Sequence, residues 1–163
     1  MINDKSTEID SKWLTVYVDA GFANGIGTYG IWVRIQPGRR TFEGKLPNVI
    51  NNNEAEMAAA VLGLKHGLAF WREHYKENPA GITIASDSNH TRVRLSAAVI
   101  PAYTKSGNRV SIMEQTIHKE FYSLLPKGVF FRFKPVKGHS GKRKVAGWLN
   151  DWCDQASRRA RNS

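Results

Sequence analysis

Cysteine is nearly absent from this chain, and long apolar runs are absent altogether. The single cysteine, Cys153, excludes an internal disulfide framework and any zinc site built from several thiolates, and it is compatible with a reducing compartment. No run approaches the roughly 18 apolar residues of a membrane span, and residues 1–11 are polar and acidic, without the apolar centre of a signal peptide. We therefore expect a cytoplasmic protein that does not contact a membrane.

Acidic residues are scarce relative to basic ones. The chain has 24 Lys and Arg against 14 Asp and Glu, a formal net charge of +10, which favours an anionic partner, nucleic acid before membrane. A merely basic soluble protein is the plainer alternative. The length of 163 residues with 41% hydrophobic content suits one domain, expected over 13–160, with a flexible segment over 1–12 and a tail over 161–163. We expect fraying from Ser157 onward.

The first third of the chain predicts three strands joined by short loops. Apolar and polar residues alternate up to Asp19, and the glycines between Gly21 and Gly27 predict a turn. Further strands are expected over 29–35 and 40–46, separated by a Pro-Gly turn signal. Three strands in succession with short connections predict an antiparallel meander.

The remainder alternates between helices and strands. An Ala-rich helix is expected over 53–75, then a short strand over 82–86 that ends at Asp87. Because a long helix precedes it, this strand is expected to run parallel to the first one, which places Asp19 and Asp87 at the same sheet edge. Helices over 91–99, 111–125 and 145–160 and a final strand over 129–136 complete the pattern. The fold class is therefore α/β, with a five-stranded mixed sheet, three strands antiparallel and then two parallel, and helices on both faces.

Acidic residues recur at the ends of these elements. The candidates are Asp19, Glu54 or Glu56, Asp87, and Asp151 or Asp154. Each has a plain explanation, since Asp opens turns and Glu in the first turn of a helix is favoured by the helix dipole. Gathered together, however, carboxylates repel one another unless a cation neutralises them. Oxygen-only sites suit Mg²⁺ or Mn²⁺, and two such ions about 4 Å apart catalyse phosphodiester hydrolysis.

Five short motifs in order carry a family resemblance. They are Val18-Asp19-x-Gly21, Asn52-Asn53-x-x-Glu56-x-x-Ala59, Ser86-Asp87-Ser88, Val136-Lys137-Gly138-His139-Ser140-Gly141 and Asn150-x-x-x-Asp154. Together they resemble type 1 ribonuclease H, a likeness that runs from Trp13 to Arg159. Members of that family are monomers by default, and they use two Mg²⁺ ions, with Mn²⁺ as a substitute, to hydrolyse the RNA strand of an RNA/DNA hybrid, leaving 5′-phosphate and 3′-hydroxyl ends.

The resemblance implies roles for single residues. It selects Glu56 over Glu54 and Asp154 over Asp151, so the metal-binding catalytic residues are expected to be Asp19, Glu56, Asp87 and Asp154. His139 is implied to assist proton transfer or product release. Recognition of the 2′-hydroxyl needs small polar and backbone groups close to the sugar. The expected substrate-binding residues are Gly21, Asn24, Asn52, Asn53, Ser88 and Asn89, with Lys105, Lys142, Arg143 and Lys144 on phosphates.

The chain departs from the family pattern at several positions. Ala20-Gly21 stands where Gly-Ser is usual, and Glu54 stands where Arg is common. The segment from Leu95 to Arg109 lacks the basic, substrate-binding segment of some members. We therefore expect the loop over 142–144 and the Arg-rich C-terminus to contribute more to substrate binding.

Two other functions remain open at this point. The same fold serves junction resolvases and the nuclease domains of polymerases and transposases, so the substrate could differ. A non-catalytic nucleic-acid-binding module would share the basic charge but would not need the carboxylates.

Overall fold

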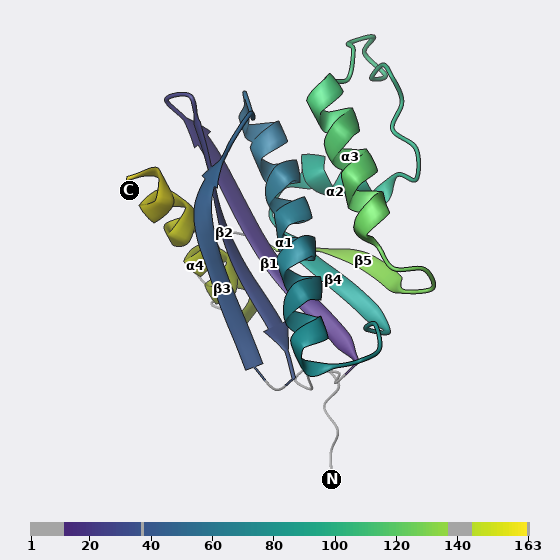
Figure 1. Cartoon of the computed structure of the whole chain (residues 1–163). Coiled ribbons are helices and arrows are strands. Elements are labelled where there is room, and N and C mark those ends of the chain that lie inside the picture. Colours follow the sequence, from purple (N-terminus) through teal and green to yellow (C-terminus); the bar gives the residue numbers. More distant parts are fainter. Residues whose placement is uncertain (1–11, 37, 137–144, 163) are drawn as a thin grey trace.

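The computed structural model describes residues 12–36, 38–136 and 145–162, with side chains from 12–36, 38–136 and 152–162. It contains a five-stranded sheet in the order β3-β2-β1-β4-β5, with helices on both faces (Figure 1). Within the described ranges, no helix is long and apolar enough to cross a membrane. The elements are β1 Trp13–Ala23, β2 Ile26–Ile35, β3 Gly38–Leu46, α1 Asn52–His74, β4 Gly81–Ser86, α2 Asn89–Ser96, α3 Ile112–Leu124, β5 Phe130–Pro135 and α4 Val145–Arg161.

The strand directions confirm the mixed sheet that the sequence predicts. β1, β2 and β3 form an antiparallel meander, whereas β4 runs parallel to β1 and β5 runs parallel to β4. α1 connects β3 to β4, and such a crossover connection is what lets two strands run parallel. Pro135 ends β5 at the sheet edge, where a missing N–H costs no ladder hydrogen bond.

The predicted glycine-rich turn over 21–27 is wrong. β1 continues to Ala23 and β2 starts at Ile26, so the turn consists of Asn24 and Gly25 alone, with φ values of 54° and 76°. A two-residue Asn-Gly turn in this left-handed conformation matches the twist of the strands that it joins. Gly21 and Gly27 therefore lie within the paired strands.

One face of the sheet is covered by α1, with α2 and α3 beside it (Figure 1). Asn51 caps α1 by accepting a hydrogen bond from the Glu54 N–H at 2.8 Å. α2 ends at Ser96, three residues before the end that the sequence predicts, and Ser88 caps its start. Phe121 of α3 packs against the Phe131 and Phe133 rings of β5, with centroids 5.1 and 6.0 Å away.

The opposite face of the sheet is covered by α4. Tyr17, Trp32 and Ala85 form a second apolar cluster there with Cys153, which is completely buried. Fraying from Ser157 is not observed, since α4 continues to Arg161. Ser157 is buried and its Oγ lies 2.7 Å from the Thr28 Oγ1, so a hydrogen bond holds the last turns of α4 to β2.

Candidate active site

Asp19 and Asp87 reach the same edge of the sheet because their strands are in register. Tyr17 of β1 pairs with Ala85 of β4, and each acid follows two residues later. In a strand, residues two apart lie on the same face, so both carboxylates project from the sheet side by side. Asp19 is 5% exposed, whereas Asp87, just past the end of β4, is exposed.

The two glutamates at the start of α1 have different partners. Glu54 turns back on the helix end, where its carboxylate accepts hydrogen bonds from the Ile50 N–H at 3.3 Å and the Asn51 amide at 3.4 Å. Glu56 lies two residues further on, and about 200° around the helix axis, so it faces the sheet instead. Glu54 therefore caps its helix, and Glu56 is free to join the aspartates.

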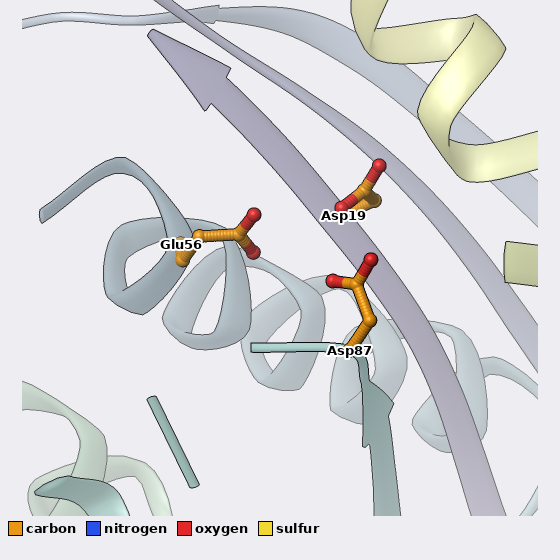
Figure 2. A group of neighbouring side chains, drawn as sticks. All are labelled: Asp19, Glu56 and Asp87. Carbon is orange, nitrogen blue, oxygen red and sulfur yellow. The ribbon is translucent and has the colours of Figure 1, made fainter. Parts of the chain in front are cut away.

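Three carboxylates meet at this edge. One oxygen each from Asp19, Glu56 and Asp87 lies within 4.8 Å of the other two. Figure 2 shows the carboxyl groups of Glu56 and Asp87 directed toward Asp19, although the three residues come from different elements. Asp154 of α4 is near enough to hydrogen-bond with Asp19. The Arg158 Nε lies 3.3 Å from the Asp154 Oδ2.

The electrostatics of the cluster are unfavourable for the protein alone. The pKa of Asp19 is raised to about 9, first by burial and then by the charges of Glu56, Asp87 and Asp154. The pKa of Glu56 is raised to about 8, first by burial and then by the charge of Asp87. Both groups therefore hold protons near neutral pH unless a cation replaces them.

The residues fit a hard divalent cation. All the donors are carboxylate oxygens, which Mg²⁺ and Mn²⁺ prefer to nitrogen or sulfur. The Glu56 Oε2 is buried without a hydrogen-bond partner among the described residues. A buried polar atom without a partner is costly, and a bound cation would remove that cost together with the repulsion between the acids.

The comparison with known protein families decides which family the chain belongs to. The RNase H family model matches residues 11–162, which is nearly the whole chain. This chain belongs to the ribonuclease H family. It is similar to a ribonuclease H of Acidithiobacillus ferrooxidans, 25% identical over 152 residues that cover 88% of this chain and 89% of that protein. A ribonuclease H of Aliivibrio salmonicida is 27% identical over 159 residues, covering 94% of this chain and 90% of that protein.

Solved structures of low sequence identity share the fold. RNase H1 of Halobacterium salinarum superposes with a TM-score of 0.64 at 15% identity, over 92% of this chain and 98% of that one. LC11-RNase H1, solved in complex with an RNA/DNA hybrid, gives a TM-score of 0.58 at 11% identity, over 90% of this chain and 98% of that one. As a ribonuclease H, the chain is an enzyme that cleaves RNA.

A glycine allows α4 to pack close to the sheet beside the carboxylates of this ribonuclease H. Gly30 of β2 is the register partner of Asp19, and a Cβ at Gly30 would lie 2.2 Å from the Cys153 carbonyl oxygen. The backbone of α4 can therefore approach the sheet next to Asp19, and the following residue is Asp154. Sequence reasoning did not single out Gly30, although a glycine inside a predicted strand is a known signal of close backbone approach.

The other predicted site residues lie in different environments. Asn24 is exposed in the β1–β2 turn, while Asn52 and Asn53 are exposed at the start of α1. Ser88 is engaged in capping, since its Oγ accepts from the Thr91 N–H at 3.1 Å. The side-chain Oδ1 of Asn89 accepts a hydrogen bond from the Arg92 guanidinium.

Lys105 is exposed on the segment between α2 and α3, which lies at the same end of the molecule as the start of α1 (Figure 1). Four predicted residues fall outside the described part of the chain. They are His139, Lys142, Arg143 and Lys144.

Proposed function

We propose that this enzyme hydrolyses the RNA strand of RNA/DNA hybrids at the Asp19, Glu56, Asp87 and Asp154 cluster, with two Mg²⁺ ions as cofactors and Mn²⁺ as a substitute. The products are RNA fragments with 5′-phosphate and 3′-hydroxyl ends. The observation that carries the proposal is the convergence of three carboxylates within 4.8 Å in a chain of the ribonuclease H family. The complex of the similarly folded LC11-RNase H1 with an RNA/DNA hybrid supports the choice of substrate.

The cluster has the chemistry that this reaction requires. When bound, the metal ions would supply an activated water and neutralise the charge that develops on the leaving oxygen. The residues of the chain hold that site: Asp19 and Glu56 from the buried side, and Asp87 from the exposed side. Arg158 keeps the Asp154 carboxylate directed along α4, near Asp19. His139 is proposed to assist proton transfer or product release.

Substrate binding is proposed to combine charge with small polar contacts. The net charge of +10 attracts the phosphate backbone without reading sequence, so affinity is expected to fall with salt. Lys105, Lys142, Arg143 and Lys144 are proposed to contact phosphates. The 2′-hydroxyl groups of the RNA strand are proposed to meet the group of polar and glycine residues around the site, namely Gly21, Asn24, Asn52, Asn53, Ser88 and Asn89.

A labelled hybrid tests the proposal directly. Cleavage of the RNA strand is expected with Mg²⁺ and is expected to stop with chelator. The new 5′ ends should be labelled by a polynucleotide kinase only after a phosphatase has removed their 5′-phosphate. Duplex RNA, duplex DNA and a four-way junction, assayed alongside, separate this activity from that of a resolvase or another nuclease of the same fold. The Asp19→Asn variant should bind hybrid and be inactive; cleavage at the wild-type rate by this variant would refute the proposed site.

Three further predictions from the sequence remain to be tested. They are the monomeric state, the cytoplasmic location and the domain limits of 13–160. Sedimentation, cell fractionation and limited proteolysis address them in turn.

A further inference from the structure

The last turn of α4 brings an arginine against β1. A Cβ built at Gly21 would lie 2.6 Å from the Arg161 Nη2 and 3.8 Å from the Ser157 Oγ. The Arg161 guanidinium therefore occupies the space that any side chain at position 21 would take. Gly21 lies two residues after Asp19 on β1, on the same face of the sheet. Arg161 thus packs on the strand that carries the first carboxylate of the cluster.

Arg161 also lines up with the cluster along α4. Seven residues separate it from Asp154, which is almost two helical turns, so both side chains lie on one side of the helix. The rise between them is about 10 Å at 1.5 Å per residue. Asp154 lies close to Asp19, and Ser157, between the two, hydrogen-bonds with Thr28. This side of α4 therefore faces the sheet from the carboxylates to Gly21.

The guanidinium differs from its neighbours in having no acidic partner. Arg158 pairs with Asp154 at 3.3 Å, and Arg159 pairs with Glu43 at 3.1 Å. Among the described residues, no carboxylate pairs with Arg161, and its Nε is buried without a hydrogen-bond partner. The residue as a whole is partly exposed. A planar cation with a donor that no described protein group uses is suited to an anion such as phosphate.

We propose that Arg161 binds a backbone phosphate of the hybrid, a few nucleotides from the phosphate that is cleaved. This inference rests on the proposed function and singles out one residue of the Arg-rich C-terminus as the substrate contact. Each strand of a duplex carries a phosphate about every 3.4 Å along the axis, and Arg161 packs beside Gly21, two residues or about 7 Å beyond Asp19 along β1, so the phosphate that it meets lies within a few nucleotides of the one that is cleaved. Gly21 leaves the space that the guanidinium needs.

The test compares Arg161→Gln with wild type on a labelled hybrid over a series of salt concentrations. Gln keeps part of the side-chain stem and its hydrogen bonding but removes the charge. We expect KM to rise about tenfold while kcat stays within about twofold, since the contact is remote from the reacting atoms. The slope of log kcat/KM against log salt should become shallower by about one, the value of one phosphate contact.

Arg72→Gln is the matched control. It removes the same charge from an exposed position in the last turn of α1, 16 residues after Glu56, or about 24 Å along the helix. We expect its KM and salt slope to equal those of wild type. An Arg72→Gln effect as large as that of Arg161→Gln would mean that net charge alone is responsible, and the inference would be wrong.

A second variant tests the contact with Gly21. Gly21→Ser should displace the guanidinium and raise KM in wild type, and it should raise KM less in the Arg161→Gln background, where only the proposed contact of Gly21 with the 2′-hydroxyl is left to lose. Fully additive effects on KM would show that Gly21 does not act through the position of Arg161. If Arg161→Gln keeps the wild-type KM and salt slope, Arg161 does not bind substrate, although hybrid cleavage by wild type would still stand. If wild type cleaves no hybrid, the proposed function itself fails.

Discussion

Two clusters in this molecule contain buried carboxylates, and they differ in the charge of the groups that surround those carboxylates. Glu114 of α3 is 8% exposed, and its Oε1 lies 2.5 Å from the His90 Nε2 and 3.4 Å from the Arg94 Nε of α2. At the sheet edge, Asp19 and Glu56 are buried as well, yet their neighbours are further acids. The first cluster contains basic partners for its buried carboxylate, whereas in the second, within the described residues, Arg158 pairs with Asp154 but no basic side chain pairs with Asp19 or Glu56.

The difference separates a structural carboxylate from a candidate catalytic one. Glu114 joins α2 to α3, so its basic partners stabilise the fold directly. The Asp19 cluster, in contrast, raises the pKa of two of its members and leaves the Glu56 Oε2 without a partner. Perturbed pKa values of this kind gather at functional sites, because the stability that they cost is recovered only when a ligand binds.

The largest effect is expected for activity when the second cluster is altered. Glu56→Gln should lower kcat on an RNA/DNA hybrid by roughly a thousandfold, since removing a metal-binding carboxylate costs several kcal/mol of transition-state stabilisation. Its thermal stability without metal should equal or exceed that of wild type, because the substitution removes repulsion. Single-turnover cleavage and thermal unfolding measure the two. The neighbouring change Glu54→Gln is the control, and an equal loss of activity there would contradict the assignment.

The opposite pattern is expected for the first cluster. Glu114→Ala should lower the free energy of unfolding by about 3 kcal/mol, because His90 and Arg94 lose their shared acidic partner in a mostly buried position. At temperatures where the variant is folded, kcat should change by less than about threefold. Urea unfolding followed by circular dichroism measures the loss. Unchanged stability together with lost activity would reverse the distinction between the two clusters.

The close packing of α4 on the sheet is expected to affect both stability and metal binding. Gly30→Ala places a methyl group against the Cys153 carbonyl oxygen and should cost about 2 kcal/mol of stability. Because Asp154 follows Cys153, the shift of α4 should also weaken Mg²⁺ binding. Isothermal titration with Mg²⁺ and unfolding experiments check the two consequences. Gly38→Ala, at a glycine where a Cβ would meet open space, is the control, and it should leave both unchanged.

The smallest effect concerns pH. The pKa values of Asp19 and Glu56 rise on folding from 3.8 and 4.5 to about 9 and 8, so protonation favours the folded state. The stability that these groups contribute is present below about pH 4 and is lost as pH rises through 8 to 9. With chelator, Asp19→Asn should therefore gain at least about 3 °C in Tm over wild type at pH 9, a shift of roughly 1 kcal/mol for a domain of this size.

Added Mg²⁺ sharpens the same experiment. It should raise the Tm of wild type more at pH 9 than at pH 5, because the cation competes with the bound protons. The Tm of the Asp19→Asn variant should rise less with Mg²⁺ than that of wild type, at pH 5 and at pH 9. Equal pH profiles for the two proteins would show that the carboxylates do not interact in the folded state.

The pattern of residues along the chain predicted most of the fold, and it singled out the three acids that gather at the sheet edge. Alternating apolar residues and an Ala-rich segment are local signals, so the order of strands and helices and the parallel pairing of β1 with β4 followed from them. The ends of elements were less certain. The turn at Asn24-Gly25 is shorter than predicted and α4 is longer, because pairing of Gly21 with Thr28 and the bond between Ser157 and Thr28 are contacts between distant residues.

What the sequence alone determined is which side chains are available: three acids at the ends of elements and a fourth on the last helix, an excess of basic residues, and a single cysteine, which cannot form an internal disulfide. Only the tertiary structure decided how they are used. Glu54 caps a helix while Glu56 faces the sheet, Gly30 lets α4 approach Asp19, and Arg161 occupies the space beside Gly21. The physical reason is that charge repulsion, burial and close packing depend on distances of a few ångströms between residues far apart in the chain, and a local pattern does not specify such distances.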